Sequence, residues 1–195
     1  MESVNMFHNE KLPEVIVFAG PNGSGKSTVT RLAKIIEPYI NADDIKRSIQ
    51  CSDLDAAIKA EHLRELAVAN KISFTFETVL STERNLNLLK RAKQNGFFVR
   101  CFYILTANVN VNIARVKSRV ANGGHNVPED KIRSRFTKAL ALIPALINVC
   151  DVMHIYDNTK SLHRIFKKRK EQFFFWEDCF WSKIQISTLT GIQFN

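Results

Sequence analysis

The chain has 195 residues, of which 45% are hydrophobic and 24% are charged, and this balance excludes a disordered or fibrous protein. The formal net charge of +9 favours polyanionic ligands such as nucleotides, sugar nucleotides or nucleic acid, without choosing among them. The start of the sequence lacks the basic and apolar stretches of a secretory signal, and no apolar run reaches the roughly 20 residues that a membrane span requires.

We therefore expect a cytoplasmic protein that has no membrane partner. A chain of this length folds most readily as one unit, so residues 1–195 are expected to form a single domain, with a core over about 14–160 and a tail over about 161–195. The four cysteines stand singly, without a CxxC pair, and predict neither a metal site nor a disulfide. Two of them, Cys101 and Cys150, lie in apolar segments and are expected to be buried.

The first strand, loop and helix are the clearest predicted elements. Residues 14–19 form a short β-branched and aromatic run between Pro13 and Gly20, which predicts a buried strand. Residues 26–37 place apolar side chains at helical spacing, and Pro38 ends that pattern. The order strand, glycine loop, helix follows.

The rest of the chain alternates short apolar strands with amphipathic helices. Strands are predicted over 39–41, 72–76, 97–105 and 152–156. Helices are predicted from Asp43 or Asp44 to about residue 50, and over 54–70, 82–95, 109–121 and 129–147. The helix over 54–70 is expected to bury Ala57, Ile58, Leu63, Leu66 and Ala67. The alternation implies parallel βαβ crossovers, and hence a three-layer α/β fold whose central, mostly parallel sheet carries helices on both faces.

A phosphate-binding loop follows the first strand. The sequence Gly20-Pro21-Asn22-Gly23-Ser24-Gly25-Lys26-Ser27 matches the pattern G-x-x-x-x-G-K-[ST], and it opens a predicted helix, which is the context that the motif requires. Its glycines allow backbone amides to turn inward around a phosphate. We expect this loop to bind ATP, with Lys26 on the β- and γ-phosphates, Ser27 on Mg²⁺, and Thr28 completing the nucleotide-binding segment.

Two acidic residues follow predicted strands, at the carboxyl edge where ligands bind in open α/β sheets. Asp43 is expected to accept a proton from a substrate hydroxyl and to orient that hydroxyl for attack, whereas Asp44 is expected to cap the following helix. Glu77 ends the third strand beside Thr78, and both are candidates to bind substrate hydroxyls, with positioning of metal-bound water as a second role for Glu77. A helix cap and a solvated strand-end acid are the alternatives.

Arginines on both sides of a glycine-rich loop complete the candidate residues. The four that flank the loop over 122–128 are Arg115, Arg119, Arg133 and Arg135. A guanidinium there could bridge two oxygens of a phosphoryl group during transfer, and we choose Arg119 and Arg133 by position, with a surface role as the alternative. His125 within the loop is a candidate contact to phosphate or substrate, or else a turn residue.

Taken in order, several motifs resemble those of zeta-toxin-like P-loop kinases of the compact branch. They are Gly20 to Thr28, Asn41-Ala42-Asp43-Asp44, Phe76-Glu77-Thr78, Gly123 to Glu129, and Tyr156-Asp157-Asn158, and together they cover about residues 14–160. The resemblance implies a sheet of five parallel strands with the first strand between the third and fourth. It also implies phosphorylation of a small acceptor by ATP, and in zeta toxins the acceptor is a sugar hydroxyl of UDP-N-acetylglucosamine.

The same resemblance assigns roles to single residues. Asp43 takes the general-base position, Glu77 that of the acid after the third strand, and Lys26 that of the loop lysine, while Arg119 and Arg133 fall in the lid region. The sequence departs from the pattern at Asn41, where toxins commonly carry a further Asp, and after Glu77, where a glycine-rich continuation is missing. These departures concern the sugar-nucleotide acceptor rather than the phosphate chemistry.

The tail joins a basic run, Lys167 to Lys170, to an aromatic run from Phe173 to Trp176. We expect the rings to pack on a sheet or helix face, and we give binding of a partner protein or of nucleic acid less weight. Two functions other than a metabolite kinase stay open: a polynucleotide or RNA-end kinase, and a nucleotide-gated binding module of a toxin-antitoxin pair, whose partner would be an antitoxin protein.

Overall fold

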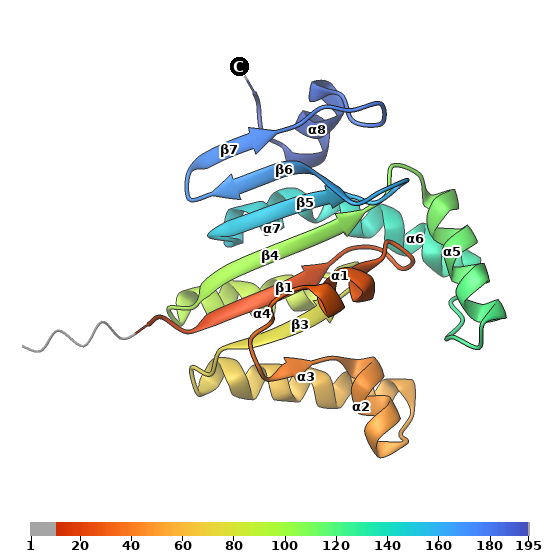
Figure 1. Ribbon diagram of the computed structural model, residues 1–195. Helices are drawn as coiled ribbons and strands as arrows, with labels where there is room; N and C mark the ends of the chain where they lie inside the picture. Colours follow the sequence, from red (N-terminus) through yellow and green to blue (C-terminus); the bar gives the residue numbers. More distant parts are fainter. Residues whose placement is uncertain (1–10, 195) are drawn as a thin grey trace, which may run out of the picture.

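A computed structural model describes residues 11–194, and in this range the chain builds one sheet of seven strands in the order β2-β3-β1-β4-β5-β6-β7 (Figure 1). The expectation that the chain starts without a secretory signal falls largely on residues 1–10, which lie outside the described residues. The strands are β1 (Glu14–Ala19), β2 (Tyr39–Ile40), β3 (Phe74–Thr78), β4 (Phe98–Leu105), β5 (Val152–Asp157), β6 (His163–Arg169) and β7 (Gln172–Phe175). The helices are α1 (Lys26–Leu32), α2 (Ala42–Ile49), α3 (Asp53–Ala69), α4 (Glu83–Gln94), α5 (Val109–Ala121), α6 (Glu129–Ala141), α7 (Ile143–Val149) and α8 (Lys183–Thr190).

The first five strands run parallel and confirm the expected order, with β1 between β3 and β4. Residues Val15 to Ala19 of β1 are at most 5% exposed, as the continuous apolar pattern of a strand within a parallel sheet requires. The sheet has more strands than the expected five because the tail adds β6 and β7, which pair antiparallel beyond β5.

Helices lie on both faces of the sheet, as predicted, but they cover the two faces unequally. On one face, side chains such as Val17, Phe76 and Met153 join a large core with α3, α4, α7 and α8. On the other face, Ile16 and Phe18 pack under the segment that contains α1. Figure 1 shows α1 in front of β1, with α4 and α7 behind the sheet. No helix within residues 11–194 combines the length and the apolar character that a membrane crossing needs.

Two predicted helices end earlier than their patterns indicated. The first was expected to run to residue 37, but α1 ends at Leu32, because the backbone of Ile36 turns to exchange two hydrogen bonds with the hydroxyl of Thr75 in β3. The helix predicted over 129–147 is divided into α6 and α7 around Leu142. Pro144 lies in the first turn of α7, where its missing N–H does no harm, whereas inside a continuous helix it would break the hydrogen bonding.

The buried side of α3 also differs from the expected one. Of the expected set only Ala67 is buried; Ala57 is exposed, and Ile58, Leu63 and Leu66 are 37–55% exposed. The residues that α3 buries are Ala56, Ala60, Arg64, Ala67 and Val68. Small side chains let the helix approach the sheet closely, and the guanidinium of Arg64 covers the ring of Phe76 at 5.2 Å.

The tail packs on the rest of the fold, but only half of its aromatic run does so as expected, since Phe174 and Trp176 are 43% and 41% exposed. Phe166 and Trp181 are buried in the large core, and Phe173 and Phe175 pack against it. The basic run is divided by the strand, because Lys168 points into the core and donates a 2.7 Å hydrogen bond to the carbonyl oxygen of Ile147. Cys101 and Cys150 are buried, as predicted.

Candidate active site

The phosphate-binding loop connects β1 to α1 along a path that only glycine follows without strain. Gly20, Gly23 and Gly25 have φ angles of 141°, 78° and 100°. A Cβ atom at Gly23 would lie 2.5 Å from the carbonyl oxygen of Asn112, and Cβ atoms at the other two would collide with the Ile104 carbonyl oxygen and the Asn158 side chain. Glycine is therefore required at all three positions.

Two asparagine side chains from outside the loop donate hydrogen bonds to carbonyl oxygens of the loop. Asn112 of α5 donates a 2.7 Å hydrogen bond to the carbonyl oxygen of Asn22, and Asn158 after β5 donates a 2.8 Å bond to that of Ser24. Sequence reasoning missed Asn112, although an amide on the apolar side of an amphipathic helix was a signal that could have found it. We call these two hydrogen bonds the Asn112 and Asn158 braces. Because they bind loop carbonyl oxygens, they leave the loop N–H groups directed toward the cleft.

The inward N–H groups are free to bind an anion. Among residues 11–194, the loop N–H groups that donate to no protein acceptor are those of Asn22, Gly23, Gly25, Lys26 and Ser27. A series of unpaired amides in a glycine-rich loop fits the oxygens of a phosphate chain. The residues present therefore suit the triphosphate of ATP, and Thr28 lines the same cleft one residue further on.

The loop lysine is close to the charged groups that face it. Nζ of Lys26 donates to the carbonyl oxygens of Gly20 (2.8 Å) and Pro21 (3.0 Å). Burial lowers the pKa of Lys26 to about 8; Glu77 and Asp43 oppose this shift, and Arg119 adds to it. The loop lysine thus interacts with three of the predicted site residues across the cleft.

Glu77 is clamped between two hydroxyl groups at the carboxyl end of β3. Ser27 Oγ donates to its Oε2 at 2.9 Å, and Tyr39 Oη donates to its Oε1 at 2.9 Å. Burial, followed by the charge of Glu77, raises the pKa of the Tyr39 phenol, which therefore remains a donor. The oxygens of Ser27 and Glu77 are ligands of the kind that Mg²⁺ prefers, so these two residues could hold that ion. Tyr39 was missed because its strand pattern gave no sign of which face it occupies.

Asn41, not Asp44, caps α2. Its Oδ1 accepts the N–H of Asp43 at 2.9 Å, and its Nδ2 donates to Tyr39 Oη at 2.8 Å. The expected Asp44 cap is wrong because α2 begins at Ala42, so Asp44 lies inside the first turn and pairs with Arg47. The helix start leaves the Asp43 side chain exposed on the cleft wall, and within residues 11–194 its carboxylate has no ion-pair partner.

Thr78 lines the cleft, but its hydroxyl is engaged by the protein. Its Oγ1 accepts hydrogen bonds from the N–H of Leu80 at 3.0 Å and from Nδ2 of Asn85 at 2.8 Å. These bonds fix the turn after β3, in which Leu80 has a φ of 53°. Thr78 therefore positions the wall beside Glu77, and its expected contact with substrate stays a prediction.

Three of the four arginines reach the cleft, and Arg133 does not. Arg115, Arg119 and Arg135 line it together with His125. Arg119 donates a 2.7 Å hydrogen bond to the carbonyl oxygen of His125, which ties α5 to the glycine-rich loop. Arg115 donates to the carbonyl oxygen of Thr159 at 3.2 Å, while its Nη1 is buried without a partner among the described residues. The three arginines therefore add positive charge to the cleft that Asp43 also lines.

Arg133 lies on another side of α6. Its guanidinium donates to Oε1 of Glu129 at 2.8 Å and to Oδ1 of Asn110 at 3.1 Å, and it is absent from the cleft wall. Residues 133 and 135 are about 200° apart around a helix, so only one of them can face the cleft. The structure brings Arg135 there in place of the predicted Arg133.

The cleft between these groups has a volume of about 820 Å³. Its cationic lining consists of Lys26, Arg31, Arg115, Arg119, Lys131 and Arg135, and its acidic lining consists of Asp43, Asp53 and Glu77. Clefts of this size bind drug-sized or cofactor-sized ligands. The excess of cations suits a ligand, or a pair of ligands, with several negative charges.

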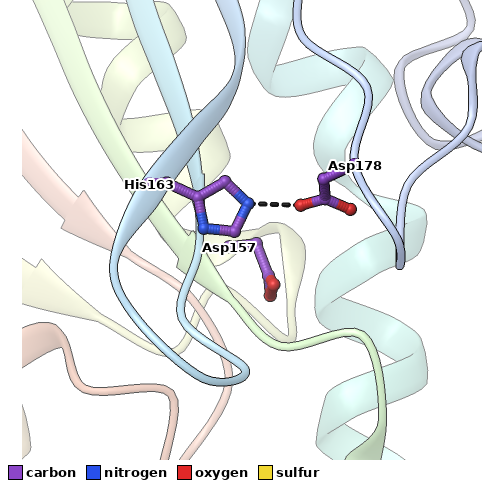
Figure 2. Close-up of side chains that lie close together, drawn as sticks. All are labelled: Asp157, His163 and Asp178. Atoms are coloured by element: carbon purple, nitrogen blue, oxygen red, sulfur yellow. Dashed lines mark hydrogen bonds and ion pairs between the residues drawn. The ribbon is translucent and has the colours of Figure 1, made fainter.

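A second polar cluster lies beyond the cleft, where the tail meets β5. Figure 2 shows His163 at the start of β6 beside Asp178 and the buried Asp157, and their ligand atoms lie within 4.8 Å of one another. His163 pairs with Asp178 through Nε2, and its Nδ1 lies 2.9 Å from the carbonyl oxygen of Ser161. Asp157 accepts hydrogen bonds from Thr159, so both carboxylates already have partners. The cluster fastens the tail to the sheet.

This cluster predicts a pH-dependent stability. The hydrogen bond to the Ser161 carbonyl, and then Asp178, raise the pKa of His163 above its usual value of about 6.5. The folded state therefore binds the proton more tightly, and the stabilisation is fully present below pH 6.5 and is lost as pH rises through the raised pKa. In urea unfolding, the wild type should lose stability relative to His163→Gln as pH rises above about 6.5. Parallel profiles for the two proteins would contradict this role.

The Asn112 brace gives a second prediction. Asn112→Ala removes the hydrogen bond that orients the loop and leaves the Asn22 carbonyl without its partner, so the free energy of unfolding should fall by about 1–3 kcal/mol. The dissociation constant for ATP should rise, as isothermal titration calorimetry would measure. Asn110→Ala is the matched control, because Asn110 lies on the same helix and contacts Arg133 instead of the loop. Equal effects of the two substitutions would show that the brace does not shape the site.

The strand order, with the loop after β1 and with carboxylates after β2 and at the end of β3, defines a P-loop fold of the kinase type. The chain belongs to the zeta toxin family, whose sequence model matches residues 36–171. That match does not include the phosphate-binding loop, so the loop and the family are independent observations.

One relative and two solved structures are similar to this chain. An uncharacterized protein of Haemophilus influenzae is 36% identical over 129 residues, which make up 63% of this chain and 92% of that protein. The AvrRxo1-ORF1:-ORF2 complex with ATP contains a chain with a TM-score of 0.68 at 13% identity, matching 85% of this chain, which spans 61% of the other's length. The PezAT toxin-antitoxin system of Streptococcus pneumoniae has a TM-score of 0.60 at 17% identity, over 92% of this chain and 84% of the other. At these identities the two structures share the fold alone.

Proposed function

We propose that this protein is a kinase that transfers the γ-phosphate of ATP to a hydroxyl group of a small metabolite. The observation that carries the proposal is the position of Asp43, which lies exposed on the cleft wall and interacts electrostatically with the loop lysine. A carboxylate without an ion-pair partner, facing the phosphates, is the group that accepts a proton from an attacking hydroxyl. A nucleotide switch that only binds and releases its ligand needs no such base.

In the proposed reaction the acceptor hydroxyl donates its proton to the carboxylate of Asp43. The hydroxyl oxygen forms a bond to the γ-phosphorus, the bond from that phosphorus to the β–γ bridging oxygen breaks, and ADP leaves with both electrons of that bond. Lys26, Arg119 and Arg135 stabilise the negative charge on the phosphoryl oxygens during transfer. Ser27 and Glu77 would hold Mg²⁺, which would supply positive charge to the β- and γ-phosphates.

The charge of the cleft favours an acceptor that is itself anionic. Six cationic side chains and three carboxylates line the cleft. ATP with Mg²⁺ carries two net negative charges, fewer than the three net positive charges of the cleft lining. An acceptor that carries phosphate groups would balance the remaining positive charge. UDP-N-acetylglucosamine, the acceptor that the family resemblance implies, has this property. The His125 loop and Lys131 lie on the wall that such an acceptor would contact.

The proposal is tested by incubating the protein with γ-labelled ATP and a series of acceptors. Label should pass to an anionic metabolite with free hydroxyls, and UDP-N-acetylglucosamine is the first candidate. Label on the 5′ end of an oligonucleotide would instead identify a polynucleotide kinase. No transfer to any acceptor in a metabolite extract, although ATP binds, would overturn the kinase proposal in favour of a nucleotide-gated binding module.

An antitoxin is the protein partner that the proposal includes. The structures named above that share this fold include a toxin-antitoxin system. If such a partner covers the nucleotide cleft of this chain, a small protein that copurifies with it should reduce its affinity for ATP. A partner that leaves ATP affinity unchanged would not fit this role.

A further inference from the structure

One face of the sheet is left without a helix over β4 to β7. In Figure 1 no helix lies in front of these strands, whereas α1 lies in front of β1. Residues paired across neighbouring strands point to the same side of a sheet, so the strand register defines this open face. Its side chains are Phe98, Arg100, Phe102, Val152, His154, Tyr156, Arg164, Lys167, Arg169 and Phe174. Nearly all of them are partly exposed, while Val99, Cys101, Met153 and Ile155 on the opposite side are fully buried.

Aromatic rings form a row across the open face. Phe102 stacks on Phe18 with ring centroids 5.1 Å apart, and His154 continues the row at 5.4 Å from Phe102. At the outer edge, the rings of Phe174 and Trp176 are more accessible, with 43% and 41% of their surface exposed. These two partly exposed rings beside a stacked row form an aromatic surface that no helix within residues 11–194 covers in Figure 1.

Cations are interleaved with these rings. Arg164 lies 4.5 Å from the Trp176 ring, and Lys167 lies 5.7 Å from the Phe174 ring. Neither these two cations nor Arg169 forms an ion pair with a described residue, whereas Arg100 pairs with Glu14 at 2.7 Å. The pKa of His154 is lowered to about 4 by burial and then by Arg164, Lys167 and Arg100. The open face therefore has a positive potential as well as exposed rings.

The same residues enclose a shallow cavity of about 300 Å³. It is lined by Phe98, Arg100, Val152, His154, Lys167 and Arg169, with no carboxylate among them. An anionic group entering this cavity would meet cations from two strands and a ring on its floor.

We propose that the open face binds single-stranded nucleic acid, with backbone phosphates on Lys167 and Arg169 and bases stacked on Phe174 and Trp176. Single strands bind where a basic surface follows the backbone and aromatic rings accept the bases, independently of sequence. The cations lie directly beside the rings, at 4.5 Å for Arg164 on Trp176 and 5.7 Å for Lys167 on Phe174, which suits a strand whose phosphates alternate with its bases. The proposal concerns a surface away from the catalytic cleft and does not depend on the kinase function.

The test measures binding of a fluorescent 12-nucleotide oligouridine while a non-hydrolysable ATP analogue saturates the cleft. Lys167→Gln with Arg169→Gln should weaken binding by roughly tenfold and reduce the slope of log affinity against log salt by about 1.4, since each phosphate contact to a single strand contributes about 0.7. The matched control is Lys59→Gln with Lys138→Gln, which removes the same charge from exposed positions on α3 and α6. Equal losses for the two pairs, or no binding by the wild type, would overturn the proposal.

The aromatic half of the surface is tested separately. Phe174→Ala with Trp176→Ala should weaken oligouridine binding by roughly tenfold and leave the salt slope unchanged, because base stacking releases no counterions. Both rings are only partly exposed, so urea unfolding of the variant is measured beside the wild type, and binding is compared where both proteins are folded. A polyglutamate of the same charge should bind much more weakly than the oligonucleotide. Equal binding of polyglutamate and the oligonucleotide would show that the surface binds any polyanion, and this would contradict a nucleic-acid site.

Discussion

Replacing Asp43 by Asn is expected to reduce phosphoryl transfer by roughly 10³-fold, because an amide of the same shape cannot accept the proton of the attacking hydroxyl. The side chain is exposed on the cleft wall and has no ion-pair partner in the described residues, so the fold should be unaffected. ATP affinity should change little, since the phosphates are expected to bind to the loop amides and Lys26 and not to Asp43. The rate of ADP production with saturating acceptor measures the effect.

The neighbouring residue supplies the control. Asp44→Asn removes the same charge one residue away, but Asp44 is paired with Arg47 on the surface of α2. This variant should keep its transfer rate within a fewfold of the wild type. If both variants lose activity equally, or if Asp43→Asn remains active, Asp43 is not the base.

Removing the amine of Lys26 should have the second large effect. Lys26→Ala is expected to weaken ATP binding by at least roughly a hundredfold, because a charge-assisted contact to the phosphates is lost in a desolvated site. Lys26 also predicts the pH dependence of binding. Its pKa is about 8 in the free protein, and bound phosphates favour the protonated amine. ATP affinity should therefore be constant below pH 8 and fall as pH rises above it.

Lys26→Arg keeps the positive charge at this position but removes its loss at high pH. A guanidinium stays protonated over this range, so the variant should bind ATP with an affinity that no longer falls above pH 8, whatever its absolute value. Calorimetric titrations between about pH 7 and pH 9.5 measure both proteins. A pH-independent wild type, or the same decline in the variant, would show that Lys26 is not the titrating group.

Much of the fold was predictable because short stretches of sequence determine where individual strands and helices form. The strand that became β1 and the helix that became α5 have the predicted bounds, since continuous apolar runs and helical spacing report directly on burial. The order of the parallel strands came from the resemblance to a known family, because pairing between distant strands leaves no local mark. The seven-stranded sheet was not predicted, since β6 is rich in cations and its pairing with β5 depends on the whole fold.

Part of the candidate site was also predictable from the sequence. The phosphate-binding loop, Asp43 and Glu77 come together because parallel strands end at one edge of the sheet. What could not be predicted is the rotation of helices. The choice between Arg133 and Arg135 depends on how α6 is turned, and the buried side of α3 depends on Ala56 and Ala60 packing closely in place of the larger Ile58. Contacts across elements, such as Asn112 with Asn22, are also invisible to local patterns.

The central claim is that this cleft transfers phosphate from ATP to an alcohol rather than to water. Phosphorus NMR of the protein with ATP, Mg²⁺ and a metabolite extract measures this directly. We predict a new phosphomonoester signal that grows in equal amount with ADP and is absent with Asp43→Asn. ADP that appears together with inorganic phosphate alone would contradict the account, and so would a nucleotide that stays bound and unchanged.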